Sequence, residues 1–229
     1  IKDKTSFIVA ARRTYADLFV KPFMPASTDL TLYFYDLNAK INHKISKNDR
    51  LYLSAYMGND AFGVDYDGSR EGGKGGGGSS EDGTLNFGLG YGNITSTLRW
   101  NHLFSDKLFS NTTLTYSRYS FHTDFGVMST ENNITRDIDF GYLSGIEDLG
   151  GRIDFDYMPN PNHDIKFGTS YTYHYFFPGE THLRYDSNQV AIWDTSINFS
   201  GNTNVHEMFF YVEDNVKITN RLKANIGLH

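Results

Sequence analysis

The sequence of 229 residues contains no cysteine, which excludes disulfides, thiolate nucleophiles and thiolate zinc sites. It also contains no uninterrupted apolar run of about 20 residues, the length that a membrane-spanning helix needs. The formal net charge is −6, and the sequence has no basic stripe. A nucleic-acid partner is therefore not expected, because neutralising phosphates requires clustered lysine and arginine side chains.

The sequence also lacks the common motifs of enzyme chemistry. It has no Gly-x-Ser-x-Gly elbow, no His-Glu-x-x-His pair and no dinucleotide fingerprint. Its eight histidines include no pair with the short spacing of metal ligands. The nearest pair, His174 and His182 with Glu180 between them, is interpreted as solvated or interfacial histidines, with a ligand pair as the alternative. We expect no catalytic residue, no metal and no cofactor.

Aromatic residues are abundant, at 16% of the chain, and they are mostly tyrosine and phenylalanine. Such residues favour strands and membrane interfaces. The mean hydropathy of −0.47 is compatible with a membrane barrel, because a barrel strand shows lipid only at every second residue. With no apolar run of helical length, a membrane protein of this composition is expected to be a β-barrel.

Period-2 alternation of apolar and polar residues is the dominant pattern, as in 31–41 and, most clearly, in 165–177. It predicts an all-β fold of antiparallel transmembrane barrel strands. We expect nine strands, at approximately 5–14, 29–44, 50–62, 84–104, 109–124, 137–158, 164–177, 205–218 and 222–229.

The expected strands are joined alternately by short polar turns and longer connections. The turns are centred near residues 3, 47, 106, 162 and 220. The longer connections are expected at 21–25, 62–83, 126–136 and 178–204. This asymmetry is typical of an outer-membrane barrel, with short periplasmic turns and long extracellular loops.

The chain as a whole, residues 1–229, is expected to be one partial β-barrel domain. An odd strand count and a last strand that ends abruptly favour a piece of a larger barrel, since an open sheet edge is not tolerated in lipid. The Gly/Ser-rich stretch at 72–80 is interpreted as a natural flexible loop or, by preference, as an engineered linker.

Charged residues near the predicted loops have two interpretations each. Acidic residues there are read as solvated charge, with substrate or calcium contact as the alternative. They include Asp60, Asp65, Asp67, Glu71 and Glu81. The basic pair Arg12-Arg13 is read as an ion pair at a loop base, with contact to lipopolysaccharide phosphate as the alternative.

Three segments resemble a known family. Residues 2–15, residues 38–54 and the run Trp100 to Ser105 are similar to barrel strands of TonB-dependent receptors of the Bacteroidetes type, which have a carboxypeptidase-regulatory-like N-terminal domain. The resemblance implies a 22-stranded barrel filled by an N-terminal plug, with active uptake energised through TonB. This sequence shows neither a plug nor a TonB box. A surface lipoprotein lid is implied by analogy alone.

We therefore expect an outer-membrane transport receptor for a siderophore, haem, cobalamin, peptide or glycan, in contact with outer-membrane lipid and lipopolysaccharide. The residues expected to line its lumen are Asp36, Asn38, Lys40, Asp154, Asp156 and Lys166. The residues expected to contact a solute from the loops are Asp65, Asp67 and Trp193.

Two other classes of protein fit parts of the pattern. A small closed barrel acting as a surface adhesin or enzyme would, as an enzyme, need a serine paired with His122 or His174. A soluble β-sandwich could bind carbohydrate through Trp193, but its loops should then be balanced at both ends. Solubility in plain buffer would argue against the barrel, since a barrel needs detergent.

Overall fold

The computed structural model describes residues 4–68, 82–198 and 201–229, and almost all of them lie in strands. The strands in chain order are β1 (Thr5–Arg13), β2 (Thr28–Lys44), β3 (Asp49–Asp67), β4 (Asp82–Ser105), β5 (Leu108–Glu131), β6 (Ile134–Asn160), β7 (His163–Ser187), β8 (Val190–Asn198), β9 (Thr203–Lys217) and β10 (Lys223–Leu228). A short helix, α1 (Ala16–Val20), and a 3₁₀ turn, η1 (Lys21–Phe23), connect β1 to β2. The predicted all-β fold is confirmed.

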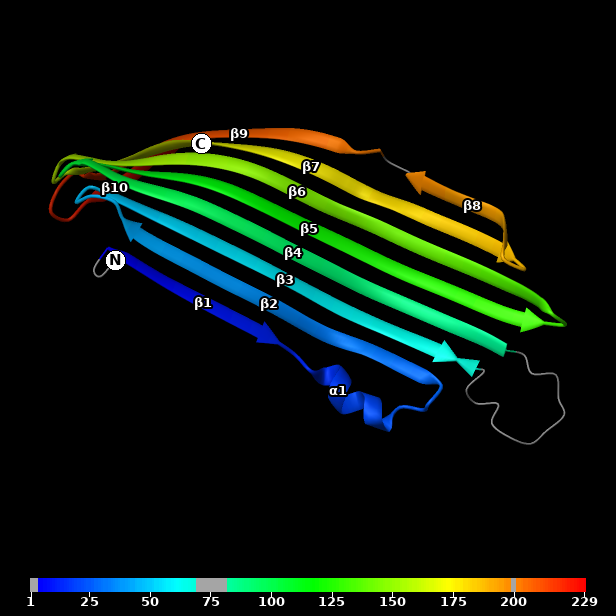
Figure 1. Ribbon diagram of the computed structural model, residues 1–229. Coiled ribbons are helices and arrows are strands. Elements are labelled where there is room, and N and C mark those ends of the chain that lie inside the picture. The colour runs from blue at the N-terminus through cyan, green and yellow to red at the C-terminus, as the bar shows by residue number, and fades with distance from the viewer. Residues whose placement is uncertain (1–3, 69–81, 199–200) are drawn as a thin grey trace.

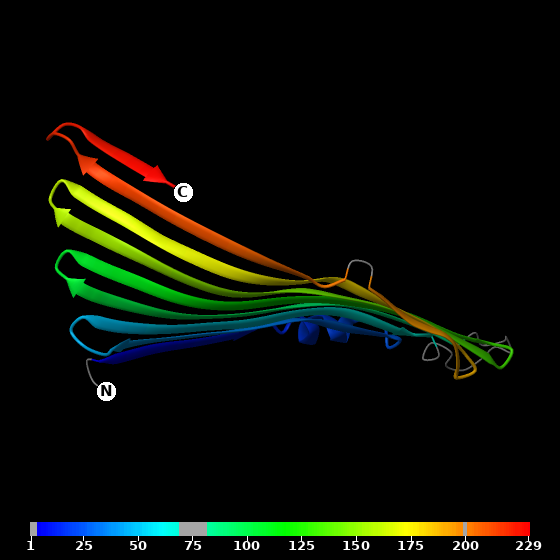
Figure 2. The same ribbon diagram turned by 90° about the horizontal axis from the view of Figure 1, so that it is seen from above.

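All ten strands form one antiparallel sheet in the order β1-β2-β3-β4-β5-β6-β7-β9-β10, with β8 paired to the far part of β7 (Figure 1). The sheet is a single curved layer that does not close, and β1 and β10 lie at opposite edges (Figure 2). Leu30 is the only buried apolar side chain among the described residues. A two-sheet sandwich with a packed core is therefore excluded for this part of the chain.

The short turns predicted near 47, 106, 162 and 220 gather at one end of the sheet (Figure 1). They connect β2 to β3, β4 to β5, β6 to β7 and β9 to β10. At the first of these turns, the Ser46 hydroxyl donates to Asp49, at 2.6 Å, and accepts from the Asn48 amide. These local side-chain bonds are the reason that serine, asparagine and aspartate favour such positions.

The far ends of the strands differ from the sequence prediction. Residues 126–136 were expected to form a loop, but β5 and β6 continue as a ladder to Glu131 and Ile134. Residues 178–204 were also expected to form a loop, but β7 runs to Ser187 and turns directly into β8. The count of nine strands was therefore wrong, and the hairpin partner β8 is the strand that was missed.

Both missed hairpins close through two residues in the left-handed region. These are Asn132 and Asn133, with φ of 51° and 62°, and Asn188 and Gln189, with φ of 50° and 64°. Two positive φ values in succession match the right-handed twist of the flanking strands, and asparagine tolerates them better than most residues.

Replacing Asn133 should show how much the β5–β6 hairpin depends on this backbone conformation. We expect Asn133→Val to destabilise the hairpin by roughly 1–2 kcal/mol, because a β-branched residue is strained at positive φ. Asn133→Gly is the matched control and should be neutral or better. Amide hydrogen exchange at Glu131 and Ile134 measures the effect, and equal protection in the two variants would contradict the assigned turn.

The remaining predicted connections fall partly within the structure. The connection at 21–25 contains η1 and follows α1. The Gly/Ser-rich stretch at 72–80, together with Glu71 and Glu81, lies outside the described residues. Within the described part of the chain, neither of the two short helical segments is long and apolar enough to cross a membrane.

Candidate functional site

One face of the sheet, here called face A, carries a broad apolar surface near the turn end. The pairing register places successive apolar residues side by side across the strands. Exposure is high there: Phe7 is 77% exposed and Met208 67%. We call this surface the apolar belt; it comprises Phe7, Leu37, Ile41, Leu53, Met57, Ile94, Leu98, Leu114, Leu149, Tyr171, Met208 and Phe210. A continuous apolar surface of this size marks a contact with lipid or with another protein.

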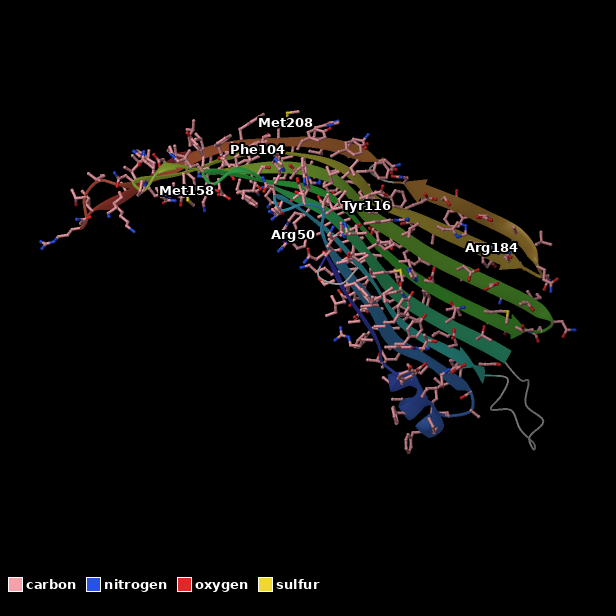
Figure 3. The ribbon with its side chains drawn as sticks, turned by 60° about the vertical axis from the view of Figure 1, so that its left-hand side comes forward. Arg50, Phe104, Tyr116, Met158, Arg184 and Met208 are labelled. Atoms are coloured by element: carbon pink, nitrogen blue, oxygen red, sulfur yellow. The ribbon has the colours of Figure 1, made fainter. Side chains whose placement is uncertain are left out.

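The opposite face, called face B, is polar over the same part of the sheet. One register row there runs Asn38, Tyr56, Thr95, Ser117, Asp148 and His174. In Figure 3 the sheet is seen as an arch, with Met208 of face A on its outer side and Arg50 of face B toward its inner side. The outer side of this part of the sheet is thus mainly apolar, apart from Arg118 and Glu147, which lie opposite each other in the row of Ile94, and the inner side is polar.

The six residues predicted to line a lumen all lie on face B. Asp36, Asn38 and Lys40 alternate along β2. Asp154 of β6 lies on the same face, and Asp156 of β6 lies directly opposite Lys166 of β7. The structure thus brings residues of three strands onto one polar face. That this face lines a lumen stays a prediction.

Arg12 is held on face B by two contacts. Its guanidinium lies 2.6 Å from the Asp36 carboxylate and stacks over the Phe34 ring. This matches the structural interpretation of the pair Arg12-Arg13, an ion pair. Arg13 points to face A, where it stacks over the rings of Tyr15 and Tyr33. The two arginines therefore lie on opposite faces, because successive side chains in a strand alternate between faces.

A second polar group on face B connects β6 with β9. Arg152 donates to the Asp154 carboxylate at 2.8 Å, and the Tyr211 hydroxyl donates to the same carboxylate at 2.7 Å. The Arg152 guanidinium also lies over the Tyr211 ring. Asp154 was predicted from the alternation, whereas Arg152 and Tyr211 were missed as its partners. The missing information was the register between β6, β7 and β9.

A third group on face B is centred on His174. It lies within β7, with Nδ1 2.8 Å from Asp148 and Nε2 3.4 Å from Glu207. The Ser117 hydroxyl donates to the same Asp148 carboxylate, at 3.3 Å, not to the histidine. This arrangement fixes the imidazole between two acids and provides no serine activated by a histidine, which would require a Ser–His contact.

His182 does not converge with His174. The pairing between β6 and β7 is irregular between Leu143 and Gly145, where β7 has one extra residue. Side chains of β7 beyond this point therefore alternate in the opposite sense. His182 is therefore on face A, where Nε2 lies 2.8 Å from Asp194. Among the described residues, no group of three or more histidine and acidic side chains is arranged to hold a metal ion.

The polarity of both faces reverses toward the far end of the sheet. On face B, one row there runs Leu30, Val64, Phe87, Phe125, Phe140 and Leu183. On face A, the corresponding row carries Asp29, Asp65, Asp139, Arg184 and Asp194. The apolar belt thus ends partway along the strands, although the same strands continue.

Arg184 is surrounded by carboxylates in this far acidic region. It donates to the buried Asp186 on its own strand and lies opposite Asp139 and Asp194. Asp137 lies opposite Asp186, so two carboxylates face each other directly. Burial, followed by the charges of Asp139 and Asp186, raises the pKa of Asp137, and Arg184 partly offsets this increase.

The three predicted solute contacts are not brought together. Asp65 and Asp67 lie in β3 on face A, whereas Trp193 lies in β8 on face B. Four strands separate β3 from β8 in the sheet. These residues also belong to strands and not to loops, because the ladders extend further than the sequence pattern indicated. A single solute contact formed by all three is thus unsupported.

Comparisons with known proteins identify a fold but no family. No family model and no curated protein matches the chain. Among solved structures, the chain is similar to the ferric yersiniabactin uptake receptor FyuA from Yersinia pestis, with a TM-score of 0.51 and 10% identity. The alignment covers 96% of this chain and 33% of the receptor, so the chain spans about a third of that receptor's length. At this identity the similarity establishes a barrel-like fold alone.

Proposed function

We propose that this chain forms part of the wall of a β-barrel receptor in the bacterial outer membrane. The observation that carries the proposal is the two-sided sheet: an apolar belt on face A and a row of ion-paired polar residues on face B, over the same strands. In such a wall the belt faces lipid and face B lines the lumen. The similarity to an uptake receptor supports active uptake of a nutrient as the task.

The dimensions of the belt support contact with a bilayer. On β7 the apolar face extends from Ile165 to Phe177, with tyrosines at 171, 173 and 175. At about 3.3 Å per residue and a strand tilt of roughly 45°, this stretch covers roughly 28 Å across a membrane. A barrel's lipid-facing band is about 25 Å tall, with aromatic residues at its borders.

The polar groups on face B suit the lumen of a barrel. Arg12–Asp36, Arg152–Asp154–Tyr211 and the His174 group each join side chains from different strands. Charged side chains at membrane depth are costly unless they face a protein or water-filled interior and are paired. On this proposal these groups are ligands for a plug domain or for passing solute, and no residue performs covalent chemistry.

The further parts of the proposal come from the sequence resemblance. They are a 22-stranded barrel, a plug domain, energisation through TonB, a Bacteroidetes origin and a surface lipoprotein lid. Candidate solutes are a siderophore, haem, cobalamin, peptide or glycan. A ferric complex is the first to test, because the similar structure is a receptor for one.

Labelling along β2 tests which face meets lipid. The chain has no cysteine, so each introduced cysteine is the sole thiol in it. We expect Asn38→Cys and Lys40→Cys to react with a charged maleimide in intact membranes, because face B meets water. Ala39→Cys and Ile41→Cys should be unreactive until the membrane is dissolved. Equal reaction rates for Lys40→Cys and Ile41→Cys would contradict the assignment of the faces.

Uptake measurements test the task. Cells expressing the full protein should accumulate radiolabelled iron from a ferric chelate, and loss of TonB should abolish this accumulation. Haem, cobalamin, peptides and glycans are assayed in parallel as the other candidate solutes. Unchanged accumulation of all of them after deletion of the gene would overturn the transport proposal, even if the membrane assignment holds.

A further inference from the structure

The connection between β1 and β2 carries exposed apolar side chains at the end of the belt. In α1 and η1, Leu18 is 60% exposed, Phe19 75% and Phe23 88%. We propose that this segment is an interfacial anchor that inserts these three side chains into the headgroup layer of the outer-membrane leaflet. The inference rests on the proposed function, since it requires the belt to face lipid.

The segment lies where the belt ends. β1 leaves the sheet after Arg13, which is opposite Tyr35 of β2. Beyond that point α1 continues beside β2, at the edge of the sheet (Figure 1). Two side-chain contacts place the segment toward face A: Tyr15 shares the Arg13 guanidinium with Tyr33, and Lys21 lies 3.0 Å from Asp29. The exposed side chains thus extend the apolar belt at its border away from the turn end.

The segment is fixed in place although α1 has only five residues, too few for an independently stable helix. The Thr14 amide donates to the Phe34 carbonyl at 2.9 Å, and the Phe34 amide donates back to the Thr14 hydroxyl. At the other end, the Thr28 amide donates to the Pro25 carbonyl. These hydrogen bonds fix both ends of the segment, and the apolar side chains of Leu18, Phe19 and Phe23 between them are exposed.

Two basic side chains flank the exposed apolar residues of the segment. Arg13 and Lys21 are both exposed; Arg13 stacks over the rings of Tyr15 and Tyr33, and Lys21 is ion-paired with Asp29. The acidic residue of α1, Asp17, is partly buried. Basic residues beside exposed aromatic and leucine side chains are the composition of segments that lie in a membrane interface, where the cations meet lipid phosphates.

Fluorescence quenching from the lipid tests the anchor. Phe19→Cys and Phe23→Cys are made separately in the full protein, labelled with the environment-sensitive dye NBD, and reconstituted into phosphatidylglycerol vesicles. These vesicles contain lipid with a nitroxide near the headgroup or deep in the acyl chain. Leu114→Cys in the belt is the lipid-exposed control, and Val190→Cys, at the start of β8, is the water-exposed control.

We expect the labels at 19 and 23 to lose fluorescence with the shallow nitroxide more than with the deep one, and the label at 114 to be quenched by lipid too. If 114 is quenched while 19 and 23 behave like 190, the anchor is refuted and the membrane wall stands. If 114 also behaves like 190, the proposed function itself fails. Quenching at 19 and 23 by the deep nitroxide alone would overturn the interfacial position.

Discussion

Leu98→Arg is expected to destabilise the folded protein in lipid by about 2–4 kcal/mol, the cost of a cation at the middle of a barrel's lipid face. Leu98 lies in the central row of the belt, between Leu53 of β3 and Leu114 of β5. Both cross-strand neighbours on face A are leucines, so a guanidinium there finds no carboxylate directly beside it. Equilibrium unfolding by guanidinium chloride in lipid vesicles measures the change.

Thr97→Arg is the matched control, because it places the same side chain one residue away on face B. Thr97 lies between Ser54 and Thr115, in a polar row. We expect a change of no more than about 1 kcal/mol there, since surface polar substitutions are usually small. Similar losses at both positions would mean that face A does not contact lipid.

Arg184→Met is expected to cost about 2–3 kcal/mol of stability at neutral pH, because it removes the cation that balances a buried carboxylate. Asp186 is only 5% exposed and accepts the Arg184 hydrogen bonds. Asp137, directly opposite Asp186, and the nearby Asp139 would then lack the compensating charge of Arg184. Replacing the carboxylate as well, in Arg184→Met/Asp186→Asn, should recover most of the loss.

The cost of Arg184→Met should depend on pH. Asp137 lies beyond the belt, and its pKa is raised by burial and by the neighbouring carboxylates, with Arg184 opposing this. A carboxyl group whose pKa is higher when folded binds more protons in the folded state, so stability falls as pH rises through the window above 3.8. Removing Arg184 should raise the pKa of Asp137 further, so the loss of stability extends to higher pH. The variant should therefore be closer to the parent protein at pH 5 than at pH 8.

Arg136→Met provides the comparison for Arg184→Met. Arg136 is on the neighbouring strand and lies 3.6 Å from Glu131, with both side chains about half exposed. An exposed ion pair contributes about 0–1 kcal/mol, so this variant should show little change in stability and little dependence on pH. Equal effects of the two substitutions would show that the Arg184 group is an ordinary surface pair.

The reversal of polarity along the strands has a physical interpretation on the proposed function. Residues of face A in the belt are apolar where lipid would surround them, and the same face becomes acidic further along, where it would meet water. Face B changes in the opposite sense, from Asp36 and Asn38 to Leu30 and Val64. A strand that crosses a membrane and continues beyond it passes through two solvents, and each face follows its own environment.

Some features of the protein follow from the sequence by itself. Alternation in 31–41 and 165–177 has a period that only a strand gives, and it identifies which residues share a face. The short turns near 47, 106, 162 and 220 are local, because serine, asparagine, aspartate and proline set the backbone there. Asp36, Asn38 and Lys40 are two residues apart in one strand, so their placement on one face could be predicted without knowing which strand pairs with it.

Other features were decided by the tertiary structure. The far hairpins depend on two successive residues in the left-handed region and on pairing between strands. Asparagine in the sequence indicates a turn, but it does not indicate how many residues the turn has. The partners of Asp154 and His174 come from β6, β7 and β9, and only the register brings them within hydrogen-bond distance. A single shift in β7 moves His182 to the opposite face from His174. Alternation assigns a side chain to one of two faces, but the neighbours it meets there depend on residues far along the chain, because pairing in a sheet is not local.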